Sequence, residues 1–243
     1  MGNIRDEFRR PNIFEIDLAA VARCVKRIRA TIGPSIHFFA TLKANAYGYG
    51  LIPAARTVVA NGADAISLVS LGDAVKLREA GIRVPIMVYA GNFPDESVVR
   101  AAENFDLIAT LHSEESLAVF KRHARKEIKV AVKLEVGPER IGVAAEDAAR
   151  FAQAIGASPL LKLHVVNAHP NVPGKGRVEE ALAWQFKRFL AACDGIERAG
   201  IKVPYKVVAS SKVLRLAGQS MALNRSEEHT SELQSRFGIS YAV

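Results

Sequence analysis

Short apolar runs alternate with amphipathic stretches along most of the chain. The apolar runs are rich in Val, Ile, Leu and Phe, which is typical of strands buried on both faces. They predict strands at Ile36–Leu42, Ala65–Val69, Ile86–Tyr89, Leu107–Thr110, Lys129–Glu135, Leu161–Ala168 and Lys206–Ala209. The stretches between them carry helical patterns. These predict helices at Leu51–Val59, Gly72–Ala80, Pro94–Ala102, Glu114–His123, Ala145–Ile155 and Glu179–Ala199.

Strands that alternate with helices predict parallel βα units. Seven such strands favour an α/β fold, a TIM-like (β/α)8 barrel truncated after about seven strands. An open doubly wound sheet is the alternative, although the chain has no dinucleotide glycine fingerprint. Loss of an eighth strand is expected to leave two open barrel edges. Near the start, Ile13–Leu18 followed by Ala19–Ala30 predicts a strand leading into a helix.

The composition changes abruptly after Asn224, where the chain reads RSEEHTSELQS. This tail resembles the in-frame translation of a common sequencing adapter. We therefore expect residues 1–224 to form an incomplete barrel and residues 225–243 to be a non-native tail. A genuine polar helix is the alternative, because the same letters have plausible capping chemistry.

The charge and composition of the chain bear on whether it binds nucleic acid, a membrane or a metal. The chain has 33 Lys and Arg against 25 Asp and Glu, a formal charge of +8, but the basic residues are spread through the predicted helices. With no aromatic-interleaved basic motif, we expect no nucleic-acid partner. With no apolar run long enough to span a bilayer and no signal-peptide core, we expect a cytoplasmic protein. Cys24 and Cys193 are interpreted as free buried thiols, and no histidine pair has metal-ligand spacing.

Lys43 follows the first predicted strand, and small residues and two tyrosines come directly after it in the run Thr41–Gly50. A lysine at the end of a buried strand is costly unless its charge is paired or its amine is used. Lysine forms Schiff bases with carbonyl compounds, and burial lowers its pKa toward that of a usable nucleophile. The alternative is a strand-end lysine that extends its amine into solvent.

The letters LKANAYGYG resemble the cofactor-lysine signature of alanine racemases, which use pyridoxal 5'-phosphate (PLP) on a barrel fold. The resemblance extends more weakly from about Asn12 to about Asn224. It implies that Lys43 forms a Schiff base with PLP and is one of two proton-transfer groups. It also implies that Tyr47 contacts the phosphate. Tyr49 stands where many family members carry histidine, and we expect little consequence.

The fifth predicted strand continues into a loop that matches the same family. Lys133 falls on the family's strand-end lysine, and Arg140 falls on its arginine before a hydrophobic residue and glycine. The resemblance implies that Arg140 binds the PLP phenolic oxygen and the substrate carboxylate, with Lys133 supporting it, in many relatives as a carbamate. The residues between them depart from the family's usual loop. Without the resemblance, Arg140 fits a surface ion pair with Glu135 or Glu139.

Two further strand ends match the family. His169 falls where the family places a histidine beside the cofactor ring, and Ser210 falls on a phosphate-binding serine. A small hydroxyl at a strand-to-helix turn can help to hold an anion, although Ser210 also fits an ordinary helix cap. The spacing of Arg225 matches the family's pyridine-facing arginine, but this residue begins the tail.

The resemblance implies racemisation between L-alanine and D-alanine, with a small amino-acid substrate and a homodimeric parent protein. The family's second proton-transfer group is a tyrosine in the C-terminal β-domain of the partner subunit. We expect this chain to lack that domain and to be inactive alone. The alternatives are racemisation of serine, lysine or ornithine, and a non-catalytic PLP-binding barrel.

Overall fold

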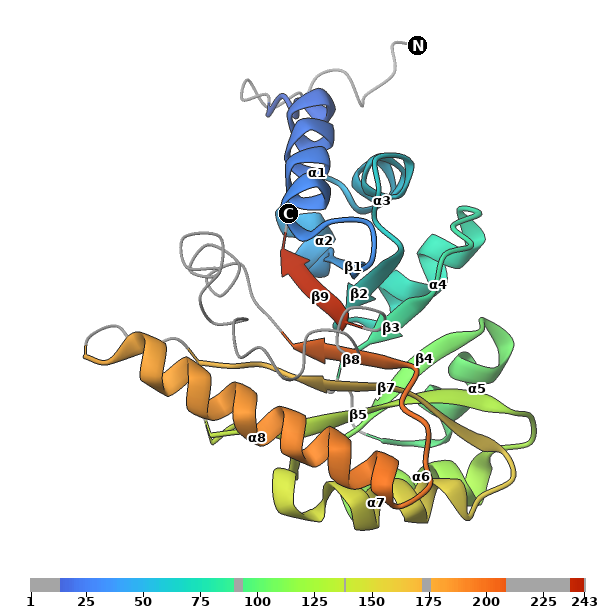
Figure 1. Ribbon diagram of the computed structural model, residues 1–243. Coiled ribbons are helices and arrows are strands. Elements are labelled where there is room, and N and C mark those ends of the chain that lie inside the picture. The colour runs from blue at the N-terminus through green and yellow to red at the C-terminus, as the bar shows by residue number, and fades with distance from the viewer. Residues whose placement is uncertain (1–13, 90–93, 138, 172–175, 209–236, 243) are drawn as a thin grey trace.

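Helices alternate with parallel strands in the computed structural model, which describes residues 14–89, 94–137, 139–171, 176–208 and 237–242 (Figure 1). The strands are β1 His37–Thr41, β2 Ala65–Leu68, β3 Ile86–Val88, β4 Leu107–Leu111, β5 Ile128–Glu135, β6 Val143–Ala144, β7 Leu161–Ala168, β8 Tyr205–Val208 and β9 Phe237–Ala242. The helices are α1 Leu18–Ile32, α2 Lys43–Tyr47, α3 Leu51–Ala60, α4 Leu71–Glu79, α5 Glu96–Asn104, α6 Glu114–His123, the 3-10 turn η2 Ala145–Asp147, α7 Ala148–Gly156 and α8 Val178–Arg198.

The sheet closes on itself as a barrel. Parallel pairing runs from β1 through β2, β3, β4, β5 and β7 to β8, and β9 pairs in parallel with both β8 and β1. The short strand β6 pairs with the end of β5. All seven strands predicted from the apolar runs are present, so the TIM-like barrel is confirmed. The prediction of two open edges is wrong for the described structure, because β9 occupies the gap between β8 and β1 (Figure 1).

The predicted N-terminal strand is a second correction. Of the segment Ile13–Leu18, the described residues 14–17 form no strand. The carboxylate of Asp17 instead accepts a hydrogen bond from Ala20 N at 3.0 Å and caps α1. An extended segment becomes a strand only when it finds a hydrogen-bonding partner, and Leu18 is already the first residue of the helix.

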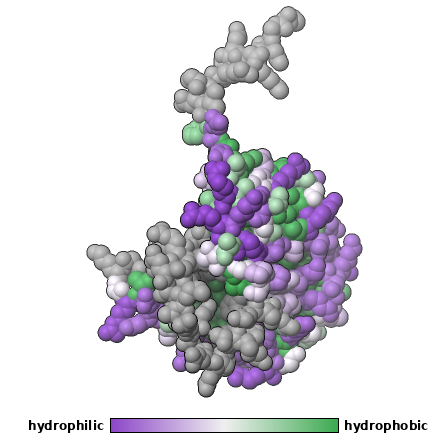
Figure 2. Space-filling view, turned by 45° about the horizontal axis from the view of Figure 1, so that its top comes forward, coloured by the Kyte–Doolittle hydropathy of each residue, from purple (hydrophilic) through white to green (hydrophobic). Residues whose placement is uncertain are grey.

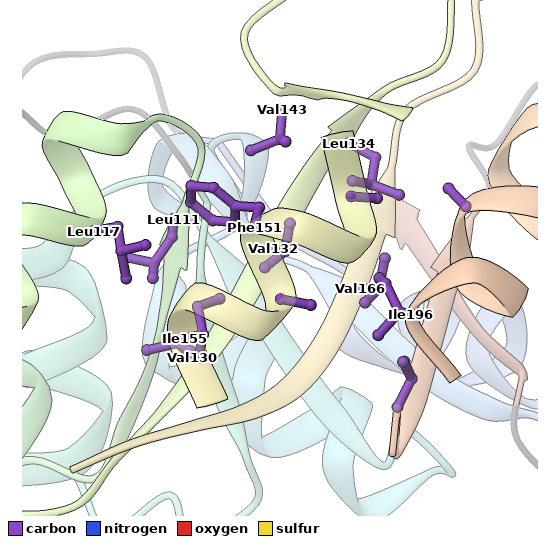
Figure 3. Packing of buried hydrophobic residues seen from close by; sticks show 14 of the residues in the cluster. Leu111, Leu117, Val130, Val132, Leu134, Val143, Phe151, Ile155, Val166 and Ile196 are labelled. Atoms are coloured by element: carbon purple, nitrogen blue, oxygen red, sulfur yellow. The ribbon is translucent and has the colours of Figure 1, made fainter. Parts of the chain in front are cut away.

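The hydrophobic core has three parts. Two clusters lie between the strands and the surrounding helices, one under α1, α3 and α4 and the other under α5 to α8. Figure 3 shows the second cluster, where Phe151 of α7 lies among Leu111, Val132 and Val143. The third cluster fills the barrel interior with one residue from each of seven strands: Phe39, Ala65, Met87, Ile108, Ala131, Val165 and Val207.

The helices turn polar side chains outward, and hydrophilic residues cover much of the described surface in Figure 2. Within the described ranges, no helix combines the length and the apolarity needed to cross a membrane. Cys193 of α8 is buried as expected, but the prediction of a buried Cys24 is wrong, because this thiol is exposed on α1.

Candidate active site

A polar ring lies directly above the apolar interior of the barrel. Side chains two residues apart on a strand face the same side. The residues two positions after the interior cluster therefore also face inward: Thr41, Ser67, Tyr89, Thr110, Lys133 and Asn167. They lie toward the carboxyl ends of the strands, where βα barrels carry their chemistry. Within the described ranges, the buried hydroxyl of Ser67 has no hydrogen-bond partner.

Lys43 lies two positions beyond Thr41, at the mouth of the barrel, and is exposed. The residues after it form a left-handed turn in place of a normal helix, with φ between 53° and 56° at Ala44, Asn45, Ala46 and Tyr47. Such backbone costs about 1–2 kcal/mol per residue in L-amino acids. The Asn45 side chain accepts a hydrogen bond from Leu51 N at 2.8 Å and ties the turn to α3.

Tyr47 lies at the end of this turn beside the lysine. The amine of Lys43 is 6.0 Å from the centre of the Tyr47 ring, and 40% of Tyr47 is exposed. Partial burial, and secondarily the neighbouring Tyr89, raise the pKa of Tyr47 above its ordinary value. The phenol is therefore neutral at physiological pH and can donate a hydrogen bond to an anion at the barrel mouth.

Lys133 of β5 is half-buried in the polar ring, opposite Asn167 of β7 in the strand register. Burial, and then the positive charge of Arg140, lower the pKa of Lys133 to about 8. Glu135 acts in the opposite direction but does not cancel them. Part of the Lys133 population is therefore a neutral amine near neutral pH, the form that can act as a nucleophile.

His169 is the first residue after β7. Its pKa is lowered to about 4, mainly by partial desolvation at the barrel mouth and then by the positive charges of Lys133, Arg140 and Lys43. The structure therefore brings all four of these predicted site residues within electrostatic reach of one another. The amide of Gln185 on α8 holds the chain two residues further on, bonding both the N–H and the C=O of Asn171.

Arg140 lies in the turn between β5 and β6. In the part of the chain that the structure describes, its guanidinium forms no ion pair, and its charge acts on Lys133 and His169. The Glu135 carboxylate instead accepts hydrogen bonds from the backbone N–H groups of Gly137 and Arg140, the latter at 2.7 Å. The alternative of a surface ion pair with Glu135 is therefore wrong: Glu135 holds the backbone of the loop.

Ser210 lies outside the described residues, as does Arg225. The sequence reasoning missed Glu135, Tyr89, Gln185 and the unsatisfied Ser67. The two-residue period of each strand could have placed Tyr89 and Ser67 in the polar ring. No local signal could have paired Gln185 with Asn171.

The chain is thus a parallel βα barrel with cationic side chains near the carboxyl ends of its strands, the end at which such barrels carry their functional sites. The chain belongs to the family described as the alanine racemase N-terminal domain, whose model matches residues 16–226. It is 32% identical to the alanine racemase of Synechocystis sp. over 210 residues, 85% of this chain and 55% of that protein.

Other relatives agree. Alanine racemase 1 of Bacillus subtilis is 35% identical over 164 residues, 67% of this chain and 42% of that protein. The alanine racemase structure from Bacillus anthracis with bound L-Ala-P superposes with a TM-score of 0.76, over 95% of this chain and 58% of that one, at 22% identity. The chain thus spans about half the length of the curated relatives it matches.

Proposed function

We propose that this chain is the cofactor-binding part of a PLP-dependent alanine racemase, which interconverts L-alanine and D-alanine and supplies D-alanine for the cell wall. The observation that carries the proposal is the gathering of Lys43, Lys133, Arg140 and His169 around one barrel mouth. Like charges brought together destabilise one another unless an anion joins them. PLP and an amino-acid carboxylate are anions, so the residues fit both.

PLP, when bound, supplies an electron sink for the negative charge at the substrate Cα. Lys43 would hold the cofactor covalently through its amine, and the same amine, once displaced by the substrate's amino group, would move the Cα proton on one face of the substrate. Arg140 binds the phenolic oxygen and the substrate carboxylate, because a planar guanidinium offers paired donors with a permanent charge. Tyr47 and Ser210 bind the phosphate.

Lys133 and His169 set the charge around Arg140. A positive Lys133 repels Arg140, whereas a carbamate on Lys133 would attract it, and the neutral amine that carbamylation needs is available at a pKa of about 8. His169 is uncharged at neutral pH, because its pKa is about 4. Its ring can therefore lie beside the cofactor without adding a further positive charge.

A homodimer is part of the proposal, because the second proton-transfer group is a tyrosine of the partner subunit's C-terminal domain. Lys43 alone then serves one face of the substrate. In D2O with PLP, we expect this chain to exchange the Cα proton of one alanine enantiomer for deuterium without inverting it. Mass spectrometry detects the exchange, and chiral chromatography detects inversion.

The Lys43→Ala variant is the control and should abolish exchange. Interconversion of both enantiomers would show a second proton-transfer group within this chain and contradict the assignment of that group to the partner subunit's C-terminal domain. Serine, lysine and ornithine tested in the same assay decide the substrate: faster exchange of any of them than of alanine would overturn the assignment of alanine.

A further inference from the structure

The loop that carries Arg140 is held from two sides by residues with no assigned role. It leaves β5 at Glu135 and returns at β6, whose two residues pair with Leu134 and Glu135. The return is tight, because a Cβ on Gly142 would lie 2.8 Å from Glu135 N and 2.9 Å from the Leu134 carbonyl carbon. Residues 135 and 142 are therefore fixed against each other, whereas Gly137 and Arg140, which lie between them, are held by other contacts.

The first of these contacts is the carboxylate of Glu135. One oxygen accepts from Gly137 N and the other from Arg140 N, the second bond being 2.7 Å long. Hydrogen bonds to an ionised acceptor are about twice as strong as neutral ones. Glu135 therefore bonds the loop at two points and holds the backbone of Arg140, whose charge acts on Lys133 and His169.

The second contact is the indole of Trp184 on α8. Gly137 has φ of 139°, and a Cβ there would lie 2.2 Å from Trp184 Cζ3, so the ring lies directly against the glycine. The Trp184 side chain is itself held by Arg188, whose guanidinium carbon is 4.9 Å from the ring centre. Arg188 in turn pairs with Glu146 at 2.5 Å.

Half of Trp184, 51%, remains exposed, so its contact with Gly137 is not part of the hydrophobic core. Glu135 likewise ends a strand without joining any of the buried clusters. Substitution of either residue should therefore leave the barrel folded. Both residues contact the loop that carries Arg140: Glu135 at Gly137 and Arg140, and Trp184 at Gly137.

We infer that Glu135 and Trp184 are positioning residues, which together fix the backbone at Gly137 and at Arg140 so that Arg140 presents its guanidinium to the anion at the barrel mouth. The role of the fixed arginine rests on the proposed function, whereas the fixing of the loop does not. If these contacts were lost, the Arg140 side chain would adopt several orientations. The anion would then bind only to the fraction of molecules in which the guanidinium points toward the barrel mouth, so its apparent affinity would fall.

The variant Glu135→Gln tests the first contact. It keeps the shape of the side chain but turns an NH2 group toward one of the two N–H donors. Glu139→Gln is the matched control: it removes the same charge from the same loop, and Glu139 makes no hydrogen bond to the described part of the chain. Trp184→Ala tests the second contact without changing charge, and Trp184→Phe is its conservative partner.

Amide hydrogen exchange is the readout that does not depend on PLP. We expect Glu135→Gln to speed exchange at Arg140 N by about tenfold or more, because a hydrogen bond to a charged group is lost. Glu139→Gln should leave that rate unchanged. Equal rates in the parent chain and Glu135→Gln would overturn the inference, whatever the chain binds.

The PLP readouts connect the loop to the site. We expect Glu135→Gln and Trp184→Ala each to weaken PLP binding about tenfold. In both variants, the lost interaction is the charge-assisted contact between Arg140 and the bound anion. They should also move the pH midpoint of the PLP visible absorbance upward, since a displaced Arg140 no longer favours the ionised phenolic oxygen. Trp184→Phe should stay near the parent.

The two proposals fail in different ways. Absence of PLP binding in the parent chain would contradict the proposed function, while the exchange rates would still decide the loop inference. PLP binding through Lys43 with the same affinity and pH midpoint in all four variants would overturn the positioning role and leave the proposed function standing.

Discussion

The charge of Lys133 on β5 lowers the pKa of His169 at the end of β7. Lys133 lies on β5 and His169 directly follows the neighbouring strand β7, where Asn167, two positions before the histidine, pairs in register with Lys133. Partial burial is the main cause of the lowered pKa of His169, and the charge of Lys133 lowers that pKa further. This relationship can be measured without any cofactor.

Replacing Lys133 with Met should raise the pKa of His169 from about 4 toward its ordinary value of 6.5, because one positive neighbour is lost. Histidine NMR titration of the free chain measures it. Lys129→Met is a matched control on the same strand: Lys129 contributes to the lowered pKa of His164, so that histidine should respond and His169 should not. A parent His169 that titrates near 6.5 would contradict the cationic cluster.

The same lowered pKa predicts how stability changes with pH. The native pKa of His169 is about 4 and the ordinary value is 6.5. Between these values the unfolded chain binds more protons than the native one, so this residue makes stability fall as the pH drops from 6.5 to 4. In His169→Asn, urea unfolding across this window should show a weaker fall. An equal fall in both proteins would remove His169 as its cause.

The left-handed turn after Lys43 makes an unusual prediction for glycine. Ala44 is exposed and has φ of 53°, where glycine avoids the steric cost of a Cβ. Ala44→Gly should therefore raise the free energy of unfolding by about 0.5–1 kcal/mol. Ala118→Gly, at an exposed position inside α6, should lower it by about 1 kcal/mol. A loss of stability in both variants would show that the turn is an ordinary helix.

The tail carries a prediction of its own. We propose that residues 225–243 derive from a sequencing adapter, and the family model, which ends at residue 226, supports that boundary. Yet β9 lies within this tail and pairs with five residues of β1. Deletion of residues 225–243 should then expose the edges of β1 and β8, lower the unfolding midpoint and increase binding of a hydrophobic dye.

Ile239→Pro tests the same strand without shortening the chain, because proline removes a backbone N–H. Thr230→Pro, outside the described strand, is its control. An unfolding curve that neither the deletion nor Ile239→Pro alters would show that β9 does not close the barrel.

Much of the fold could be predicted because the strands are short apolar runs and the helices are amphipathic stretches, two patterns that are easily told apart in this sequence. The helix α6 begins and ends where it was predicted, since Ser113 caps it with hydrogen bonds to Ser116. The prediction of an N-terminal strand was wrong because a local sequence pattern does not show whether an extended segment will find a neighbouring strand to pair with. The position of β9 could not be foreseen either, since closing a barrel depends on contacts between residues far apart in the sequence.

The candidate site was only partly predictable for a related reason. Lys133 lies near the end of β5 and Lys43, Arg140 and His169 follow strands, and parallel strands bring such residues to one edge. The left-handed turn could not be read from Lys-Ala-Asn-Ala-Tyr, in which alanine and lysine favour an ordinary helix. Glu135 was a candidate ion-pair partner of Arg140. The charges of the two residues do not show whether the carboxylate accepts hydrogen bonds from the guanidinium or, as here, from backbone N–H groups.

The central claim is that Lys43 is the lysine that binds PLP. Borohydride reduction of the chain with PLP, followed by peptide mass spectrometry, locates the modified residue. Lys133 is the natural competitor, because its pKa of about 8 also makes its amine reactive. We expect the pyridoxyl group on Lys43, and none in Lys43→Ala. Modification of Lys133 in the parent chain, or labelling of Lys43→Ala to the same extent, would contradict the account.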